Sequence, residues 1–224
     1  MPPPVTGPDP TGNAPPKGAA AMRLTRRDLA PTRIWQFDLT DWRGHFAGWC
    51  AELDRQRSQD AELRNGRSTR QGWSGPKTLF AEPGMALLRT LATRAVEQAL
   101  ADMDPLEPLP LAFEAWGNVH DAGGFNMSHI HQGALLSGVF YASAPPGSGA
   151  IVFRDPRAGP FHGLRAWRGQ NAYVESRFTP RDGTMLLFPP WLEHWVEPHA
   201  GPSPRYAVAF NVVMAGQSPA KPAA

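Results

Sequence analysis

The chain has 224 residues, 42% of them hydrophobic, which is enough to bury the core of one barrel or sandwich domain. The formal net charge is only +2, and the Lys and Arg residues are scattered, so no basic stripe for nucleic acid is indicated. Cys50 is the single cysteine, which excludes an intramolecular disulfide and a thiolate metal cluster and favours a reducing, cytoplasmic setting.

Both ends of the chain are rich in Pro, Gly and Ala. Residues 1–21 and 217–224 hold almost nothing that a core could bury, so we predict two disordered tails. The N-terminal stretch has no basic region leading into an apolar one, and no apolar run approaches the roughly 18 residues of a membrane span. We therefore expect neither secretion nor membrane insertion, and a single domain over residues 22–216.

Two segments in the first half of this domain are predicted to be amphipathic helices. "WRGHFAGWCAELDRQRS" (42–58) and "GMALLRTLATRAVEQALADM" (84–103) place apolar residues three to four positions apart. One face of each helix is therefore apolar and needs a surface to cover.

The second half is predicted to supply that surface as a sheet. Its apolar segments are short, rich in β-branched or aromatic residues and separated by Gly- and Pro-rich turns. They are "LAFEAWGNV" (111–119), "LLSGVFYAS" (135–143), "GAIVFRD" (149–155), "NAYVESRFTP" (171–180), "GTMLLFP" (183–189) and "YAVAFNVVM" (206–214). Several short strands after helices predict an α+β fold in which an antiparallel barrel or jelly roll is backed by N-terminal helices.

The histidines indicate a metal site. His129 and His131 form an H-x-H pair, and His194 follows the predicted strand at 183–189. Three neutral imidazoles suit Fe, Zn, Cu or Ni, and a three-ligand face leaves open positions for substrate or dioxygen. The alternative is that these histidines are isolated residues whose rings bond to the backbone, as is common in β proteins.

Arg205 is the observation that favours the metal site. It begins the last predicted strand, where Arg205, Ala207, Ala209 and Asn211 share one face, and the intervening residues form an apolar face suited to packing under the helices. The guanidinium is therefore expected to point inward, where it needs a carboxylate or phosphate partner. This strand has no acidic residue, so a ligand is a candidate partner.

The ordered combination of motifs resembles a bacterial subgroup of the Fe(II)/2-oxoglutarate-dependent oxygenases. The motifs span about residues 112–214 and read "NMSHIH" (126–131), "SGVFY" (137–141), "GAIVFRDPR" (149–157), "FPPWLEH" (188–194) and "RYAVAFN" (205–211). The resemblance implies a double-stranded β-helix, the jelly-roll or cupin-like barrel. It also implies Fe(II) and 2-oxoglutarate as cofactors, dioxygen as co-substrate and a small-molecule substrate.

Carried over residue by residue, the resemblance makes His129 and His194 metal ligands and Arg205 the partner of the 2-oxoglutarate C5 carboxylate. His131 stands where most of the superfamily has Asp or Glu, so it is the expected second ligand, with Asp155 as the competing carboxylate. The serine that follows the arginine by two positions in the family is here Ala207.

Other polar residues have weaker signals. Asn126 and Ser128 are candidates for lining the cofactor pocket, although polar residues just before a strand also make turns. Asn211 is a candidate for supporting the site from the inward face. His120 lies beside Asp121 and a pair of glycines in "NVHDAGG", a pattern typical of an exposed turn.

The predicted activity is oxidation, by default hydroxylation, of a C–H bond with release of succinate and CO2. One alternative is a cupin-type metal dioxygenase or isomerase that needs no cosubstrate and in which Arg205 binds an acidic substrate. Another is a non-catalytic jelly-roll binding module. The sequence predicts neither the substrate nor an oligomeric state.

Overall fold

The computed structural model describes residues 31–60, 68–105, 107–156 and 175–216. The predicted tails, residues 1–21 and 217–224, lie outside the described residues. The elements in chain order are β1 (Trp35–Asp38), η1 (Thr40–His45), α1 (Phe46–Gln59), β2 (Thr69–Ser74), η2 (Leu79–Ala81), η3 (Pro83–Met85), α2 (Ala86–Met103), β3 (Leu111–His129), β4 (Leu136–Ser143), β5 (Ile151–Arg154), β6 (Glu175–Phe178), β7 (Thr184–Phe188), β8 (Glu193–Val196) and β9 (Arg205–Met214).

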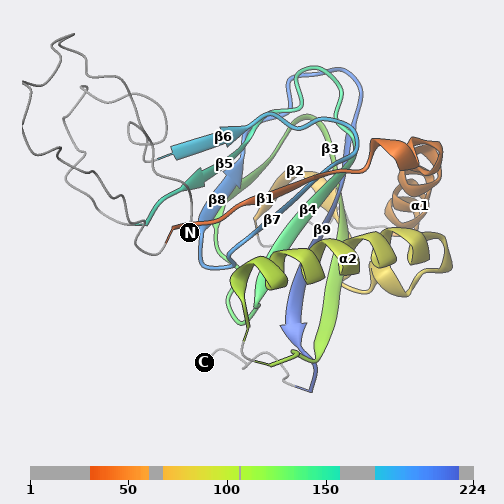
Figure 1. The fold of residues 1–224 in the computed structure, drawn as a ribbon. Helices are drawn as coiled ribbons and strands as arrows, with labels where there is room; N and C mark the ends of the chain where they lie inside the picture. Colours follow the sequence, from red (N-terminus) through yellow and green to blue (C-terminus); the bar gives the residue numbers. More distant parts are fainter. Residues whose placement is uncertain (1–30, 61–67, 106, 157–174, 217–224) are drawn as a thin grey trace, which may run out of the picture. The chain divides into compact units, whose positions relative to one another are not determined.

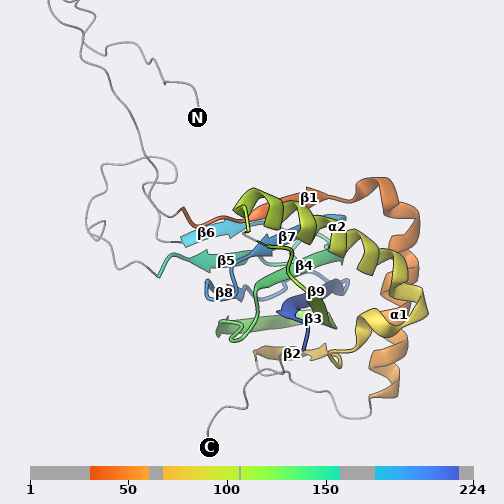
Figure 2. The same cartoon turned by 60° about the horizontal axis from the view of Figure 1, so that its bottom comes forward.

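The strands form one curled antiparallel sheet (Figure 1). Its hydrogen-bonded order is β1-β7-β4-β9-β3-β8-β5-β6, with β2 paired to β3. The arrangement is the expected double-stranded β-helix, with β1, β7, β4, β9, β2 and the first half of β3 in one wall and β8, β5 and β6 in the other. Figure 2 shows β5, β6 and β8 on the side away from α1.

Strand β3 belongs to both walls. Leu111–His120 pairs with β9, and its last residues pair with β8, with His129 directly opposite His194. The register with β2 shifts between Arg70 and Gly72, where Gln71 has a φ of 49° and Gly123 on β3 a φ of 85°. Such a bulge bends a strand, so β3 can leave one wall and end in the other.

The two faces of the sheet bury two apolar clusters. The larger cluster lies between the helices and the sheet, and the alternate residues of β9, Val208, Phe210 and Val212, belong to it. The smaller cluster lies inside the barrel and includes Ala207. The predicted division of β9 into a helix-facing and an inward face is therefore confirmed.

Both predicted helices are present, as α1 and α2. The first half of the domain is not purely helical, however, because β1 and β2 also lie there, and neither strand was predicted. β1 has four residues and β2 six, lengths over which alternation gives little signal.

Neither helix described in the structure combines the length and apolar character that a membrane crossing needs.

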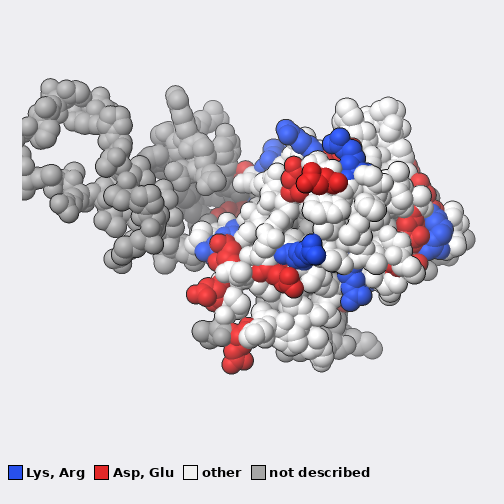
Figure 3. Space-filling view, turned by 45° about the vertical axis from the view of Figure 1, so that its right-hand side comes forward, with Lys and Arg blue, Asp and Glu red and all other residues white. Residues whose placement is uncertain are grey.

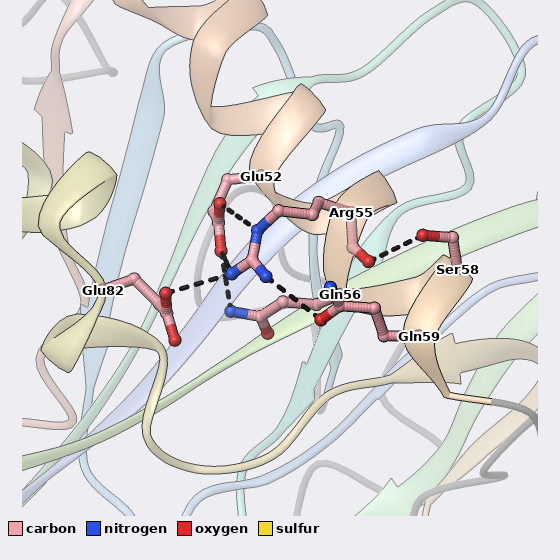
Figure 4. Close-up of polar contacts among 6 residues, drawn as sticks. All are labelled: Glu52, Arg55, Gln56, Ser58, Gln59 and Glu82. Carbon is pink, nitrogen blue, oxygen red and sulfur yellow. Dashed lines mark hydrogen bonds and ion pairs between the residues drawn. The ribbon is translucent and has the colours of Figure 1, made fainter.

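Polar contacts at the surface connect α1 to the segment before α2 (Figure 4). The Arg55 guanidinium donates from Nε to Glu52 of the same helix, at 2.8 Å, and from Nη2 to Glu82, at 3.0 Å. Gln59 accepts from the same guanidinium at 3.0 Å. Exposed ion pairs of this kind stabilise a fold little, so the helices depend mainly on their apolar faces.

We expect the packing of α1 on β3 to be a main source of stability. Leu53 is fully buried, and a Cβ placed on Gly117 of β3 would lie 2.5 Å from the Leu53 Cδ2 atom, so the side chain rests directly on the strand backbone. Leu53→Ala should lower the free energy of unfolding by about 2–5 kcal/mol. Urea denaturation measures it, with exposed Met103→Ala as the control, for which a change below about 0.5 kcal/mol is expected. A loss that small for Leu53→Ala would contradict the packing.

Candidate active site

Three imidazoles meet where β3 ends beside β8. His129 and His194 are directly opposite each other across these two strands, and the His131 backbone N–H donates to the Pro190 carbonyl at 2.8 Å, which ties the residues after β3 to the chain before β8. One ring nitrogen from each histidine lies within 4.8 Å of the others. The spacing is that of ligands around a single metal ion.

Backbone carbonyls fix which ring nitrogen faces the centre of the cluster. Nδ1 of His129 lies 2.7 Å from the Met127 carbonyl oxygen, and Nδ1 of His194 lies 2.8 Å from that of Leu192. Because a carbonyl only accepts, each Nδ1 carries the proton and each Nε2 keeps its lone pair. Nε2 of His131 and Nε2 of His194 are 3.2 Å apart. Ring nitrogens this close suit two ligands of one cation, and carbonyl-bonded Nδ1 atoms are usual in metal-binding histidines.

Burial keeps these imidazoles neutral. Loss of solvent, together with the neighbouring His129, lowers the pKa of His194 to about 3 and that of His131 to about 4. Burial also lowers the pKa of His129, while its bond to Met127 opposes the shift. Neutral imidazole is the form that binds metal, so the cluster is ready for a cation at neutral pH.

The alternative carboxylate ligand, Asp155, is not in this cluster. Within the described ranges, the metal-type group consists of the three histidines alone. His131 is therefore the residue that the fold brings to His129 and His194.

The histidines open onto a cavity of about 60 Å³ between the two walls. Trp116, Asn118 and His120 of β3 line it from one side, and Tyr141 of β4 and Arg205 of β9 from another. The histidines and Arg205 therefore face one shared space.

Arg205 is a buried cation in the wall of this cavity. Its side chain is 2% exposed, and burial lowers its pKa. Nη1 donates to the Ser148 carbonyl at 2.5 Å and Nη2 to Nδ1 of His120 at 2.7 Å. Among the described residues, neither Nε nor the buried Tyr141 hydroxyl has a hydrogen-bond partner. Across the described residues no carboxylate pairs with Arg205, so its charge is available to an anionic ligand.

Of the three remaining candidates, Asn126 lines the cavity, whereas Ser128 and Asn211 do not. Asn126 is buried, lines the cavity and donates to Ser68 and Thr69 on the β2 side. Ser128 donates to Glu193 at 2.6 Å and lies outside the cavity lining. Asn211 is buried away from the cavity and accepts a bond from Ser137 at 3.0 Å.

His120 and Tyr141 are two of the cavity residues that sequence reasoning missed. The interpretation of His120 as an exposed turn residue is wrong, since it is 1% exposed and lies within β3. The signal that could have found it is alternation, because Trp116, Asn118 and His120 occupy one face of the strand. Tyr141 could have been found the same way, two positions after Val139 in the strand "SGVFY".

Comparisons with known proteins bear on the barrel region and on the fold. Residues 114–211 match the model of a family described as "Putative 2OG-Fe(II) oxygenase". No match was found among curated proteins.

Several solved structures resemble this one. HygX from Streptomyces hygroscopicus, with nickel and 2-oxoglutarate bound, is 16% identical over 85% of this chain and 86% of its own, with a TM-score of 0.59. A Pseudomonas putida prolyl-4-hydroxylase is 18% identical over 84% and 96%, with a TM-score of 0.56. SnoN, a non-heme alpha ketoglutarate dependent epimerase from nogalamycin biosynthesis, is 16% identical over 86% and 85%, with a TM-score of 0.60. These likenesses confirm the predicted fold.

The first prediction at this site concerns metal content. Replacing His129 or His194 with alanine should abolish stoichiometric Fe(II) binding and leave the fold intact, because each removes one of three ligands. His131→Ala should behave the same way, and Asp155→Ala should keep a full equivalent. Elemental analysis of the anaerobically loaded variants measures it. Full iron retention in His194→Ala, or loss of iron in Asp155→Ala alone, would overturn this ligand set.

The second prediction concerns acid stability of the metal-free protein. Folded-state pKa values below the usual 6.5 mean that the unfolded chain binds more protons, so stability is complete above about pH 6.5 and falls as the pH drops toward 4 and 3. At pH 5 the His131 and His194 imidazoles should each cost on the order of 1–2 kcal/mol. Urea denaturation at pH 7.5 and 5 measures the loss. His194→Leu should reduce it, and exposed His45→Leu should not; equal losses in all three proteins would contradict the assignment.

Proposed function

We propose that the protein oxidises a C–H bond of a small-molecule substrate with dioxygen, with hydroxylation as the default outcome, because residues 114–211 match the model of a 2OG-Fe(II) oxygenase family. 2-Oxoglutarate is converted to succinate and CO2 in the same reaction. In this proposal His129, His131 and His194 hold the iron, and Arg205 holds the cosubstrate.

One observation carries the proposal. A single cavity joins a cluster of three neutral imidazoles to a buried guanidinium that has no carboxylate partner in the described parts of the chain. A 2-oxo diacid matches both ends, since its 2-oxo carboxylate chelates a metal and its far carboxylate pairs with a guanidinium. Arg205 matches the far carboxylate with charge and with a planar set of N–H donors.

The donors present fit both groups. Three imidazole nitrogens suit Fe(II) and leave coordination positions open. The unpartnered Nε of Arg205 and the unpartnered Tyr141 hydroxyl are buried donors of the kind that a carboxylate would satisfy. Iron bound there would supply the activation of dioxygen and the decarboxylation of the 2-oxo acid.

The contribution of the chain itself is binding, orientation and exclusion of water. Arg205 and Tyr141 would donate to the far carboxylate, which fixes the 2-oxo end toward the histidines. The carbonyls of Met127 and Leu192 hold the His129 and His194 rings with Nε2 inward. The apolar walls, among them Val139 and Phe188, keep bulk water from the space between the two ends.

The surface is consistent with a small-molecule substrate rather than nucleic acid. The face shown in Figure 3 has acidic and basic side chains interspersed, without an extended basic stripe. The solitary Cys50 supports a cytoplasmic location as part of the proposal.

Arg205 provides the sharpest test. Arg205→Ala should weaken binding of 2-oxoglutarate to the Fe(II) protein by about a hundredfold or more, because it leaves a buried carboxylate without its partner. Arg205→Lys should recover part of the loss, since it keeps the charge without the planar donors. Anaerobic titration, followed by the charge-transfer band of a 2-oxo acid chelated to Fe(II), measures the affinity.

The control is Arg177→Ala, which removes an exposed arginine paired with Glu197 and should bind as the parent does. Unchanged affinity in Arg205→Ala would show that the arginine is not the cosubstrate partner. A parent protein that binds iron but gives no such band would favour the cosubstrate-free cupin alternative. A parent that binds neither would favour the non-catalytic module.

A further inference from the structure

His120 is the buried titratable residue of the cavity to which the proposed mechanism gives no role. It lies in a row of three residues across three strands, because it pairs with Gly72 of β2 on one side and with Arg205 of β9 on the other. The same register that brings β3 beside β9 therefore places an imidazole next to the guanidinium.

Two glycines hold the His120 ring in place. A Cβ on Gly72 would lie 2.6 Å from the His120 Cδ2 atom, and a Cβ on Gly124 would lie 2.8 Å from the same atom. Neither distance is possible for a real side chain, so only glycine lets the backbone close on the ring from both positions. The imidazole is confined between them and has little freedom to move.

The confined ring is a hydrogen-bond acceptor for Arg205. Nη2 donates to Nδ1 of His120 at 2.7 Å, and since a guanidinium only donates, Nδ1 is unprotonated and the ring is neutral. Burial, reinforced by the charge of Arg205, lowers the pKa of His120 to about 3, which keeps the ring neutral at physiological pH. The Ser148 carbonyl, a second neutral acceptor, holds Nη1.

Neutral acceptors bind the Arg205 guanidinium without cancelling its charge, whereas a carboxylate would cancel it. Asp or Glu at position 120 would also hold the guanidinium, but it would cancel the charge that attracts an anionic ligand. An imidazole fixes the direction of Arg205 and leaves its positive charge available. The position of the guanidinium in turn sets the distance between the metal face and the far carboxylate site.

We propose that His120 is a positioning residue that fixes the Arg205 guanidinium and thereby sets which chain length of 2-oxo diacid the cavity accepts. The inference rests on the proposed function, since it takes Arg205 as the receptor of the far carboxylate. Removing the acceptor should weaken 2-oxoglutarate binding and should also reduce discrimination against 2-oxoadipate, which is longer by one methylene.

The test measures binding to the nickel-loaded protein by calorimetry, so that no turnover is involved. His120→Leu should bind 2-oxoglutarate about tenfold or more weakly, as expected for loss of a hydrogen bond to a charged group, and should bind the two acids with more similar affinities. His120→Asn, whose amide oxygen can occupy the position of Nδ1, should restore most of both properties. His120→Gln, whose oxygen reaches beyond that position, should not.

The glycines allow an independent test without changing His120. Gly72→Ala and Gly124→Ala should displace the ring and reproduce the loss of discrimination in part. Gly48→Ala is the matched control, because a Cβ there meets nothing within 4 Å; it should match the parent. Nickel content and thermal melting of each variant establish that the metal centre and the fold are retained, and if His120→Leu does not fold, the His120→Asn and His120→Gln pair decides.

The outcomes separate the two proposals. If Arg205→Ala loses 2-oxoglutarate but His120→Leu and His120→Gln bind and discriminate like the parent, the role of His120 is overturned and the proposed function stands. If the nickel-loaded parent binds no 2-oxo acid, both are overturned. Weaker binding with unchanged discrimination in the His120 variants would also overturn the inference, because a general loss of structure explains it equally well.

Discussion

A buried positive charge is the constraint on which the rest of the site depends. Burying a guanidinium costs several kcal/mol unless its donors and its charge are satisfied. In Arg205 two donors are satisfied, by a carbonyl and an imidazole, and both acceptors are neutral. The hydrogen bonds of the guanidinium are therefore only partly present, and none of the described residues balances its charge. An anion that enters the cavity and pairs with this group should therefore increase the free energy of unfolding. The same electrostatic interaction would contribute to ligand binding and to stability.

Strand β3 connects the surroundings of Arg205 to the helices and to the histidine cluster. Its outward residues pack under α1, where Gly117 admits Leu53, and its inward residues line the cavity. Its end supplies His129, opposite His194. Because one strand carries the helix contact, the support for Arg205 and one histidine of the cluster, the two ends of the cavity are held at a set spacing by a continuous backbone rather than by separate loops. Sites built on rigid elements keep their geometry more closely than sites on loops.

The sequence predicted those parts that depend on local pattern. Alternation along residues 205–212 was enough to separate the inward arginine from the helix-facing side, and the H-x-H pair before an apolar strand was enough to suggest a ligand pair. It could not predict His120, since two glycines after a His-Asp pair favour a turn, and the opposite outcome depends on β2 pairing alongside. The choice between His131 and Asp155 likewise depends on the register that sets His129 opposite His194. Register is a relation between two strands, so the residue pattern of a single strand does not reveal it.

The three-histidine face changes the charge balance of the cavity. A divalent ion bound by neutral imidazoles keeps both of its charges, whereas a carboxylate ligand would remove one. Together with Arg205, the cavity would then present three positive charges at its two ends, with no acidic residue among those described as its lining. A dianionic 2-oxo acid with one carboxylate at each end is the ligand that offsets charge at both ends at once. A monoanion would satisfy only one end and leave the other buried and uncompensated. The same electrostatics that leave Arg205 without a partner in the described chain therefore favour a diacid over a monoacid, and this preference follows from where the charges lie, independently of the substrate that is finally oxidised.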